Sequence, residues 1–454
     1  MLFSSITFIY YFLPIFLIIY YILPNKLKNI FLLLTGIIFY FYSDPKSLLF
    51  LLILSIINYF LGKLVKKKIY LIISIIFNVS VLFYFKYLNF FLENINNIFS
   101  INLNINTILL PLGLSFYTFK LISYLIDIYK GKIDSPNILN YLNYIFLFPT
   151  ILEGPIIRFN EIEKELTKRT PAYNKFATGT KRFILGLAKK VIFADTLLLF
   201  SKSLSSLNNP TVLSYWLKAI TDTIVLYLDF SGYCDMAIGL GLLIGITIPE
   251  NFNYPLFSTT ITEFWRKWHM TLSNWFKDYI YIPLGGNRVK TLNRCLNILI
   301  VWLLTGLWHG ASWNFIIWGL YYAIILIIEK YFLKEKLEKH KILGLIYTNL
   351  LVILGFVIFN QSNLNNLFIF LKSLLGLSKI PLINIETTYY LKNYLIIFLI
   401  SILICTPFIK SILNKISKLK ISIIAEPIFY ILLLILTTAF IINSSTNPFL
   451  YFRF

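Results

Sequence analysis

Apolar residues in this chain form long runs that short polar loops separate, from residues 6–23 to residues 422–443. Many of these runs approach the ~20 residues that a helix needs to cross a bilayer. They lack the strict alternation of barrel strands, and only helices and closed barrels satisfy backbone hydrogen bonds in lipid. The pattern predicts an all-α, polytopic integral membrane protein with roughly 10–12 transmembrane or re-entrant helices.

Basic residues in the loops give the crossings a direction, because short cytoplasmic loops are enriched in Lys and Arg. The inward crossings end at basic loops: residues 6–23 at Lys26 and Lys28, 48–62 at Lys63–Lys68, and 107–129 at Lys130 and Lys132. The outward crossings, 30–43 and 69–92, end in loops with little positive charge. Continued along the chain, this alternation predicts that both termini, including the C-terminal NPFLYFRF, lie outside the cytoplasm.

Two segments depart from simple crossings. Residues 138–157 contain Phe148-Pro149 and Gly154-Pro155 and have basic loops on both sides, so we expect them to dip into the membrane and return. Interrupted backbone at membrane depth requires a protein or water-filled environment, and a cavity should therefore lie nearby. The run 295–328 also has basic residues at both ends and is expected to form a hairpin bent near Gly306 to Gly310.

Composition supports a membrane protein. The chain is 58% hydrophobic and 13% charged, whereas a soluble protein carries roughly a quarter charged residues. Its net charge of +21 resides mostly in the short loops, which argues against nucleic acid as a partner. The single cysteines, Cys234, Cys295 and Cys405, have no metal-ligand spacing and are expected to be small buried hydrophobes. We expect no bound metal and no bound cofactor.

Tryptophan and histidine concentrate in one window. Of the chain's 8 tryptophans and 3 histidines, all but Trp216 and His340 lie between Trp265 and Trp318. The pattern from Trp265 to Tyr279 predicts one amphipathic helix at the cytoplasmic interface. Its apolar face would comprise Trp265, Trp268, Leu272, Trp275, Phe276 and Tyr279, and its polar face would include Arg266, Lys267, Ser273, Asn274, Lys277 and Asp278.

His269 lies at the edge of that apolar face, beside Trp265. It either donates a single interfacial hydrogen bond or, with Arg266 and Lys267, lines the entrance for an anionic substrate. The segment YIPLGGNR after it ends in a Gly-Gly turn followed by Arg288. Arg288 either belongs to a plain turn or contacts a phosphate.

His309 is expected at the deep bend of the hairpin, flanked by Trp308 and followed by Ser312 and Asn314. An ionisable residue at membrane depth is a functional candidate. A neutral imidazole there could remove the proton from a hydroxyl that attacks a thioester, and such general-base catalysis contributes roughly 10²–10⁴-fold. The alternative is a histidine that forms a hydrogen bond across helices. His340, in a lysine-rich loop, is expected to be solvated.

Carboxylates within the apolar runs need compensation. A charged group at the bilayer centre costs about 2.5–3.5 kcal/mol on insertion scales. Asp229 and Asp235 in LYLDFSGYCDMAIGLGLL, and Glu153 in FPTILEGPI, should therefore have a basic partner, helix N–H groups or a histidine nearby. Structural pairing and direct catalysis are both open for these residues, and Asp235 is also a candidate substrate contact.

At these residues the chain resembles the membrane-bound O-acyltransferase family, and within it the bacterial branch typified by the alginate O-acetyltransferase membrane subunit. The resembling segments are the N-terminal run MLFSSITFIYYFLPIFLIIYYILP, PLGLSFYTFK (111–120), FPTILEGPIIRF (148–159), LDFSGYCDMAIGLG (228–241), NFNYPLFSTTITEFWRKWHMTLSNWFKDYIYIPLGGNR (251–288), LTGLWHGASWNFIIWGLYY (304–322) and GFVIFNQSNL (355–364). The resemblance implies that His309 is the principal catalytic histidine and His269 the second functional one.

The resemblance favours an enzyme that passes an acetyl group from a cytoplasmic thioester, acetyl-CoA or an acyl carrier, through a central tunnel to hydroxyls of an extracytoplasmic polysaccharide. A secreted or membrane-anchored serine-hydrolase-like acetyltransferase could relay the group. The expected location is the bacterial cytoplasmic (inner) membrane. Candidate substrate-binding residues are Trp265, Arg266, Lys267, Trp308, Ser312, Asn314, Asp235 and Arg288. The alternatives are a D-alanyl transferase for teichoic acid and a polysaccharide flippase or transporter, although no inverted repeat is evident.

The chain is expected to form one integral membrane domain over residues 1–454. Within it we distinguish N-terminal helices (1–130), a catalytic core with re-entrant segments (131–341) and C-terminal helices (342–454).

Overall fold

The computed structural model of the chain describes residues 1–454 apart from 106–107, 170–172, 362, 417 and 444–454. The described residues form α-helices, short 3-10 or π-helical turns and irregular loops, and they contain no β-strand. The predicted all-α class is therefore confirmed. The C-terminal NPFLYFRF, which the charge pattern places outside the cytoplasm, lies outside the described residues.

Contacts within the chain divide it into two compact units, and each is described by itself. The first contains Met1–Phe183 and Cys234–Glu250, and the second contains Ile184–Tyr233 and the described residues of Asn251–Leu450. The division into 1–130, 131–341 and 342–454 that the sequence suggests stays a prediction.

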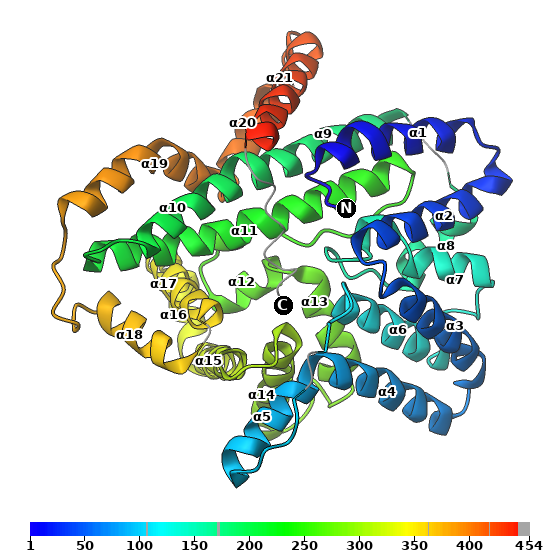
Figure 1. The fold of residues 1–454 in the computed structure, drawn as a ribbon, viewed down its shortest axis with the longest axis horizontal. Helices are drawn as coiled ribbons and strands as arrows, with labels where there is room; N and C mark the ends of the chain where they lie inside the picture. Colours follow the sequence, from blue (N-terminus) through cyan, green and yellow to red (C-terminus); the bar gives the residue numbers. More distant parts are fainter. Residues whose placement is uncertain (106–107, 170–172, 362, 417, 444–454) are drawn as a thin grey trace. The chain divides into compact units, whose positions relative to one another are not determined.

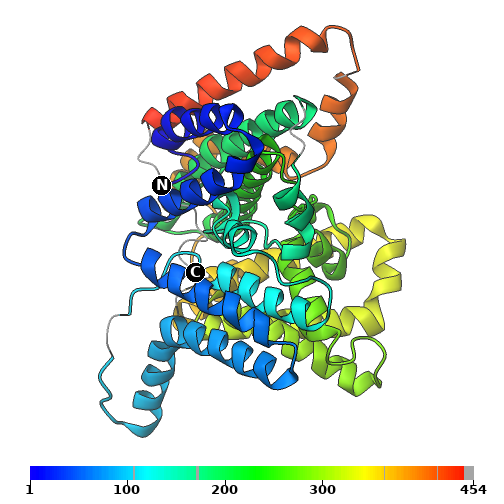
Figure 2. The same ribbon diagram turned by 90° about the vertical axis from the view of Figure 1, so that its right-hand side faces the viewer.

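The first unit begins with helices that pack against their neighbours in sequence, from α1 to α4 (Figure 2). The fourth of these, α4, also packs against α6, and α2 packs against α7. The helices of this unit are α1 (Leu13–Ile22), α2 (Asn25–Ser43), α3 (Leu48–Leu64), α4 (Lys68–Leu82), α5 (Leu88–Phe99), α6 (Leu114–Tyr129), α7 (Ile138–Ile145), α8 (Phe159–Thr167) and most of α9 (Tyr173–Ala188).

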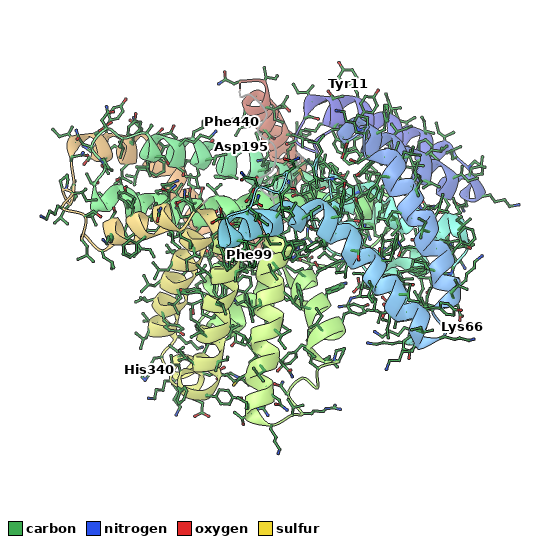
Figure 3. The ribbon with its side chains drawn as sticks, turned by 60° about the horizontal axis from the view of Figure 1, so that its bottom comes forward. Tyr11, Lys66, Phe99, Asp195, His340 and Phe440 are labelled. Carbon is green, nitrogen blue, oxygen red and sulfur yellow. The ribbon has the colours of Figure 1, made fainter. Side chains whose placement is uncertain are left out.

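The second unit contains the tryptophan-rich window. Its helices are α10 (Asp195–Ser205), α12 (Ile261–Lys267), α13 (Met270–Phe276), α14 (Thr291–His309), α15 (Trp313–Ile328), α16 (Lys334–Lys339), α17 (Lys341–Asn360), α18 (Leu364–Leu374), α19 (Ile385–Ile404), α20 (Phe408–Ile416) and α21 (Ser422–Asn443), and α11 (Val212–Leu243) belongs to it up to Tyr233. Helix α15 packs against both α14 and α17, and these helices run side by side in Figure 3, where His340 marks the turn between α16 and α17.

Several helices begin where a short polar side chain accepts a backbone N–H of the first turn, as helix N-termini require. The pairs are Asn137 with Asn140, Thr260 with Glu263, Asn363 with Asn366, and Asn384 with Thr387. Local sequence thus fixes the starts of α7, α12, α18 and α19.

Seven helices in the described residues are long and apolar enough to cross a membrane: Lys68–Phe99, Val212–Leu243, Thr291–His309, Trp313–Lys339, Lys341–Asn360, Ile385–Ile404 and Ser422–Asn443. Three shorter apolar helices, Thr7–Ile22, Leu48–Leu64 and Leu364–Leu374, bring the total of apolar helices to ten. A polytopic helical protein is confirmed, whereas the central tunnel stays a prediction.

The irregular segment 138–157 is short-helical and broken, as its prolines and glycine predict. Helix α7 ends at Ile145, a 3-10 turn spans Phe148–Thr150, and Gly154 adopts the left-handed φ of 104°. The hairpin expected over 295–328 is also present, since α14 ends at His309 and α15 begins at Trp313.

Candidate active site

The helix expected from Trp265 to Tyr279 is in fact two helices, and this expectation was wrong. Helix α12 ends at Lys267 and α13 begins at Met270, with His269 between them at φ 44° and ψ 54°, in the left-handed region. Figure 1 shows α12 and α13 as separate short helices. The break arises because Asn251, distant in sequence, accepts the Met270 N–H at its carbonyl oxygen over 2.9 Å, an interaction that a local pattern does not reveal.

The predicted apolar face is buried in the protein despite the break. Its members Trp265, Trp268, Leu272, Trp275, Phe276 and Tyr279 are all buried. Arg266 is exposed, and Lys267 forms an ion pair with Glu263 over 2.7 Å. The two-sided pattern thus identifies the faces correctly, and only the continuity of the helix fails.

Glu329 anchors the start of α12 to the end of α15. Its carboxylate, fully buried, accepts the backbone N–H of Ile261 over 2.6 Å and that of Thr262 over 2.8 Å. A negative charge at a helix N-terminus is favourable because the first N–H groups lack intrahelical partners. Sequence reasoning missed this residue, although a lone glutamate within a long apolar run is a visible signal.

Small residues allow α14 and α15 to approach closely. A methyl group on Gly306 would collide with the carbonyl oxygen of Phe315, and one on Gly319 with the carbonyl oxygen of Trp302. Reciprocal contacts of this kind are how small residues bring helices together in membranes. They fix the hairpin whose bend presents His309.

His309 is the last residue of α14 and lies in a cage of aromatic rings. Its ring centroid is 5.0 Å from Trp308, 5.1 Å from Trp318 and 5.1 Å from Phe359, each in an edge-to-face arrangement. Only 3% of the residue is exposed. The cage holds the imidazole in a defined orientation and keeps bulk water away from it.

His269 is buried in the same region rather than at the edge of a surface helix. Its ring lies 4.9 Å from Phe230 and 5.9 Å from Trp308, so the Trp308 indole contacts both imidazoles. Its Nδ1 lies 3.2 Å from Oδ1 of Asn251. His269 lies outside the seven candidate spans, and burial lowers its pKa to about 3, so its ring is neutral near pH 7.

Both histidines line one pocket of about 540 Å³, together with Trp265 and Arg266. Four of the residues that the sequence singled out thus lie around one pocket, with Trp265 and Arg266 on α12, His269 between α12 and α13, and His309 at the end of α14. It did not assign to the site other lining residues, among them Ser273, Asn274, Lys277, Tyr281 and Thr305. The volume is typical of small-molecule sites, which are mostly apolar with a few convergent polar groups.

A second pocket, of about 370 Å³, continues the first. The two share lining residues, including Thr262, Arg266 and Trp302, and the second adds Asn287, Lys330 and Lys334. Asn287 is held by Tyr281, whose hydroxyl donates over 2.9 Å, and by Lys330, whose ammonium donates over 2.8 Å. Three basic side chains, Arg266, Lys330 and Lys334, line this smaller pocket, which adjoins the pocket that contains the histidines.

Ser312, Asn314 and Arg288, also predicted to bind substrate, are not among the lining residues of either pocket. Ser312 donates to Asn314, and Asn314 donates to the carbonyl oxygen of Phe359 over 3.0 Å, so this pair ties α15 to α17. Arg288 is exposed beyond the glycine turn, where Gly285 and Gly286 have φ of 98° and 56°. Its neighbour Asn287, and not Arg288 itself, lines the smaller pocket.

Asp229, which is buried, and Asp235, which is partly buried, both have basic partners. In the second unit, Asp229 pairs with Lys190 over 2.6 Å, and Lys190 also contacts Asp195 over 2.9 Å. In the first unit, Asp235 pairs with Arg182 over 2.8 Å, and Arg182 also pairs with Glu250. These contacts favour a structural role for Asp235 over the substrate contact assigned to it.

The chain matches a known protein family over a range that includes both histidines. Residues 36–364 match the model of the membrane-bound O-acyltransferase family. The chain is 39% identical over 381 residues to the probable alginate O-acetylase AlgI of Azotobacter vinelandii, covering 80% of this chain and 76% of that protein.

More distant relatives carry related names. The chain is 37% identical over 355 residues to the peptidoglycan O-acetyltransferase of Helicobacter pylori, covering 70% of this chain and 67% of that protein. It is 31% identical over 272 residues to the teichoic acid D-alanyltransferase of Bacillus subtilis, covering 55% and 68%. The chain therefore belongs to the membrane-bound O-acyltransferase family and is a multi-pass membrane O-acyltransferase.

Proposed function

We propose that the protein transfers an acetyl group from a cytoplasmic thioester donor across the bacterial cytoplasmic membrane to hydroxyls of an extracytoplasmic polysaccharide. The observation that carries this proposal is that His269 and His309, 40 positions apart and both buried, line one pocket. The acetyl group and the polysaccharide acceptor are supported by the similarity to an alginate and a peptidoglycan O-acetylase.

In this proposal His309 is the general base. Its neutral imidazole takes the proton from an acceptor hydroxyl as the hydroxyl oxygen attacks the thioester carbonyl. A carbon–oxygen ester bond forms, the carbon–sulfur bond breaks, and the proton passes from the imidazole to the departing sulfur. The surrounding Trp308, Trp318 and Phe359 rings limit water at the thioester, which favours transfer over hydrolysis.

The donor is proposed to enter through the smaller pocket. Coenzyme A and the pantetheine arm of acyl carriers both contain phosphate, and Arg266, Lys330 and Lys334 line the smaller pocket. Arginine and lysine are the usual partners of phosphate. Because this pocket shares lining residues with the histidine pocket, a thioester held by its phosphate there could place its carbonyl near His309.

The acceptor would reach the histidines from the opposite side of the membrane, either as the polysaccharide itself or as a secreted or membrane-anchored serine-hydrolase-like acetyltransferase that relays the group. A base within a membrane hairpin suits such a reaction, since donor and acceptor arrive from different compartments. The relay and the direct route share the same chemistry at His309.

A second candidate is transfer of D-alanine to teichoic acid, which the similarity to a D-alanyltransferase favours. Mass spectrometry of groups released by mild base from cell-surface polymers, in cells with and without the gene, distinguishes the two. We expect acetate to be lost with the gene. Loss of D-alanine instead would establish the second candidate, and an unchanged acyl content with altered polymer export would favour a transporter and contradict both.

A further inference from the structure

Asn251 is a fully buried polar residue whose contacts converge on the break between α12 and α13. Its backbone oxygen accepts the Met270 N–H over 2.9 Å. Its side-chain Oδ1 accepts the Thr271 N–H over 3.1 Å and the Thr271 hydroxyl over 2.9 Å, and lies 3.2 Å from Nδ1 of His269.

These contacts decide which ring nitrogen of His269 carries the proton. A backbone N–H only donates, so the Asn251 atom that faces the Thr271 N–H is the amide oxygen. An amide oxygen only accepts, so Nδ1 of His269 must be the donor in the remaining contact. The neutral imidazole therefore has its proton on Nδ1 and its lone pair on Nε2.

Oδ1 of Asn251 also caps the N-terminus of α13, which the His269 side chain does not. His269 occupies the N-cap position of α13, and its side chain makes no cap hydrogen bond. An N-cap side chain ordinarily accepts the N–H of the second or third helical residue. Thr271 is the second residue of α13, and Asn251 accepts its N–H from a remote part of the chain. Histidine can thus occupy the N-cap position of α13 because Asn251 supplies the cap hydrogen bond.

We infer that Asn251 is a positioning residue that holds His269 in the Nδ1–H tautomer, so that His269 presents Nε2 as a hydrogen-bond acceptor to a hydroxyl or amide N–H of a substrate. The link to a substrate rests on the proposed acyl transfer, whereas the tautomer rests on the contacts alone. This role differs from an anion contact at the entrance, because a neutral acceptor repels the lone pairs of an anion. Burial, which lowers the pKa of His269, agrees with a neutral ring.

The direct test is nitrogen NMR of the full-length protein in lipid with ¹⁵N-labelled histidine. The chain contains only 3 histidines, so spectra of His269→Gln and His309→Gln assign the resonances. We expect His269 to show a protonated Nδ1 and an unprotonated Nε2 at neutral pH. A protonated Nε2, or an imidazolium, would overturn the inference. Since no turnover is needed, this result is independent of whether the protein transfers acetyl groups.

Variants separate positioning from general structure. Asn251→Asp keeps the oxygen acceptors and should retain the Nδ1–H tautomer, while its charge raises the pKa of His269. Asn251→Ala should give mixed tautomers and lower kcat about tenfold, as expected for loss of one hydrogen bond at the reacting groups. Thr271→Val removes one donor to the same oxygen but keeps the backbone N–H.

Thr271→Val is the matched control, with an expected wild-type tautomer and a kcat within about twofold of wild type. Equal loss of kcat in Asn251→Ala and Thr271→Val, with an unchanged His269 tautomer in both, would show a purely structural role and contradict the inference. If Asn251→Ala does not fold, the tautomers of the wild type and of Asn251→Asp still decide the question.

Discussion

At the scale of single residues, the site depends on two imidazoles that share one aromatic neighbour. Trp308 contacts both His269 and His309, and both line the same pocket. The titratable groups that line this pocket with them are Arg266, Lys277 and Tyr281, none of which supplies a negative charge near pH 7. A positive charge on His269 is therefore disfavoured both by burial and by the cationic side chains of Arg266 and Lys277 in the same pocket.

This environment predicts an acid-sensitive stability. The pKa of His269 is about 3 in the folded protein and about 6.5 when unfolded, so between these values only the unfolded state binds the proton. The contribution of His269 thus lowers stability as pH falls below about 6.5. Thermal unfolding of the reconstituted protein at pH 7.5 and pH 5 should show a smaller acid loss in His269→Gln than in wild type. An equal loss in both would assign the acid sensitivity to other groups.

The donor proposal also makes a prediction for single residues. Arg266→Ala should raise KM for the thioester donor by roughly tenfold, because a charge-assisted hydrogen bond to phosphate contributes about 1.5–3 kcal/mol. The effect on kcat should be small. Steady-state kinetics with a phosphate-containing donor and with a truncated acyl thioester lacking phosphate provide the check. A KM increase of the same size for both donors would count against a phosphate contact.

At the scale of elements, the site is held by connections between short helices and the α14–α15 hairpin. Glu329→Ala removes a buried acceptor of the Ile261 and Thr262 N–H groups and should destabilise the protein by about 2 kcal/mol. The exposed Glu335 provides a matched control, since Glu335→Ala should change stability by less than about 0.5 kcal/mol. Chemical unfolding measures both, and similar effects would argue against the anchoring role of Glu329.

The hairpin predicts a second effect at this scale. Gly306→Ala places a methyl group against the Phe315 carbonyl, so α14 must shift and carry His309 with it. We expect a fall in kcat of at least about tenfold from a small displacement. Leu304→Ala, on the same helix with a side chain that is 38% exposed, should retain near-wild-type kcat. Wild-type activity of Gly306→Ala would show that the close approach is dispensable.

At the scale of the whole molecule, the exposed surface carries many large apolar side chains, as a lipid-facing protein requires. We propose the orientation that the loop charges indicate. A cysteine at Lys67 should react with a membrane-impermeant reagent from the cytoplasmic side, and one at Lys46 from the opposite side, in a background in which Cys234, Cys295 and Cys405 are replaced. Labelling of both from one side would contradict the orientation.

Much of the fold follows from the sequence because helix length and apolar content are local properties. The apolar helices, the broken segment 138–157 and the hairpin turn that follows His309 were all predictable in this way. The break at His269 was not predictable. It depends on Asn251, 18 positions away, which accepts the backbone N–H groups of Met270 and Thr271 in place of intrahelical acceptors. The partner of Asp235 was predictable as a base but not as Arg182, because contacts between distant helices leave no local pattern.

The candidate site likewise contains residues that the sequence predicts and residues that it does not. Residue type singled out both histidines, membrane depth was an argument for His309 alone, and the resemblance to an enzyme family implied their roles. The contacts of Asn251 and Lys330 emerge only when the chain is folded, whereas Glu329 was visible as a lone glutamate in an apolar run although its partners were not. Conversely, Ser312 and Asn314 lie near His309 in sequence, yet they bind each other and the backbone of α17.

The central claim is that His309 removes the proton from the acceptor hydroxyl. The most direct measurement is transfer of labelled acetyl from a thioester donor to the acceptor by the purified protein in proteoliposomes, for His309→Ala beside His340→Ala, which alters an exposed loop histidine. We expect a loss of about 10²–10⁴-fold in His309→Ala and unchanged transfer in His340→Ala. Wild-type transfer by a folded His309→Ala protein would contradict the claim.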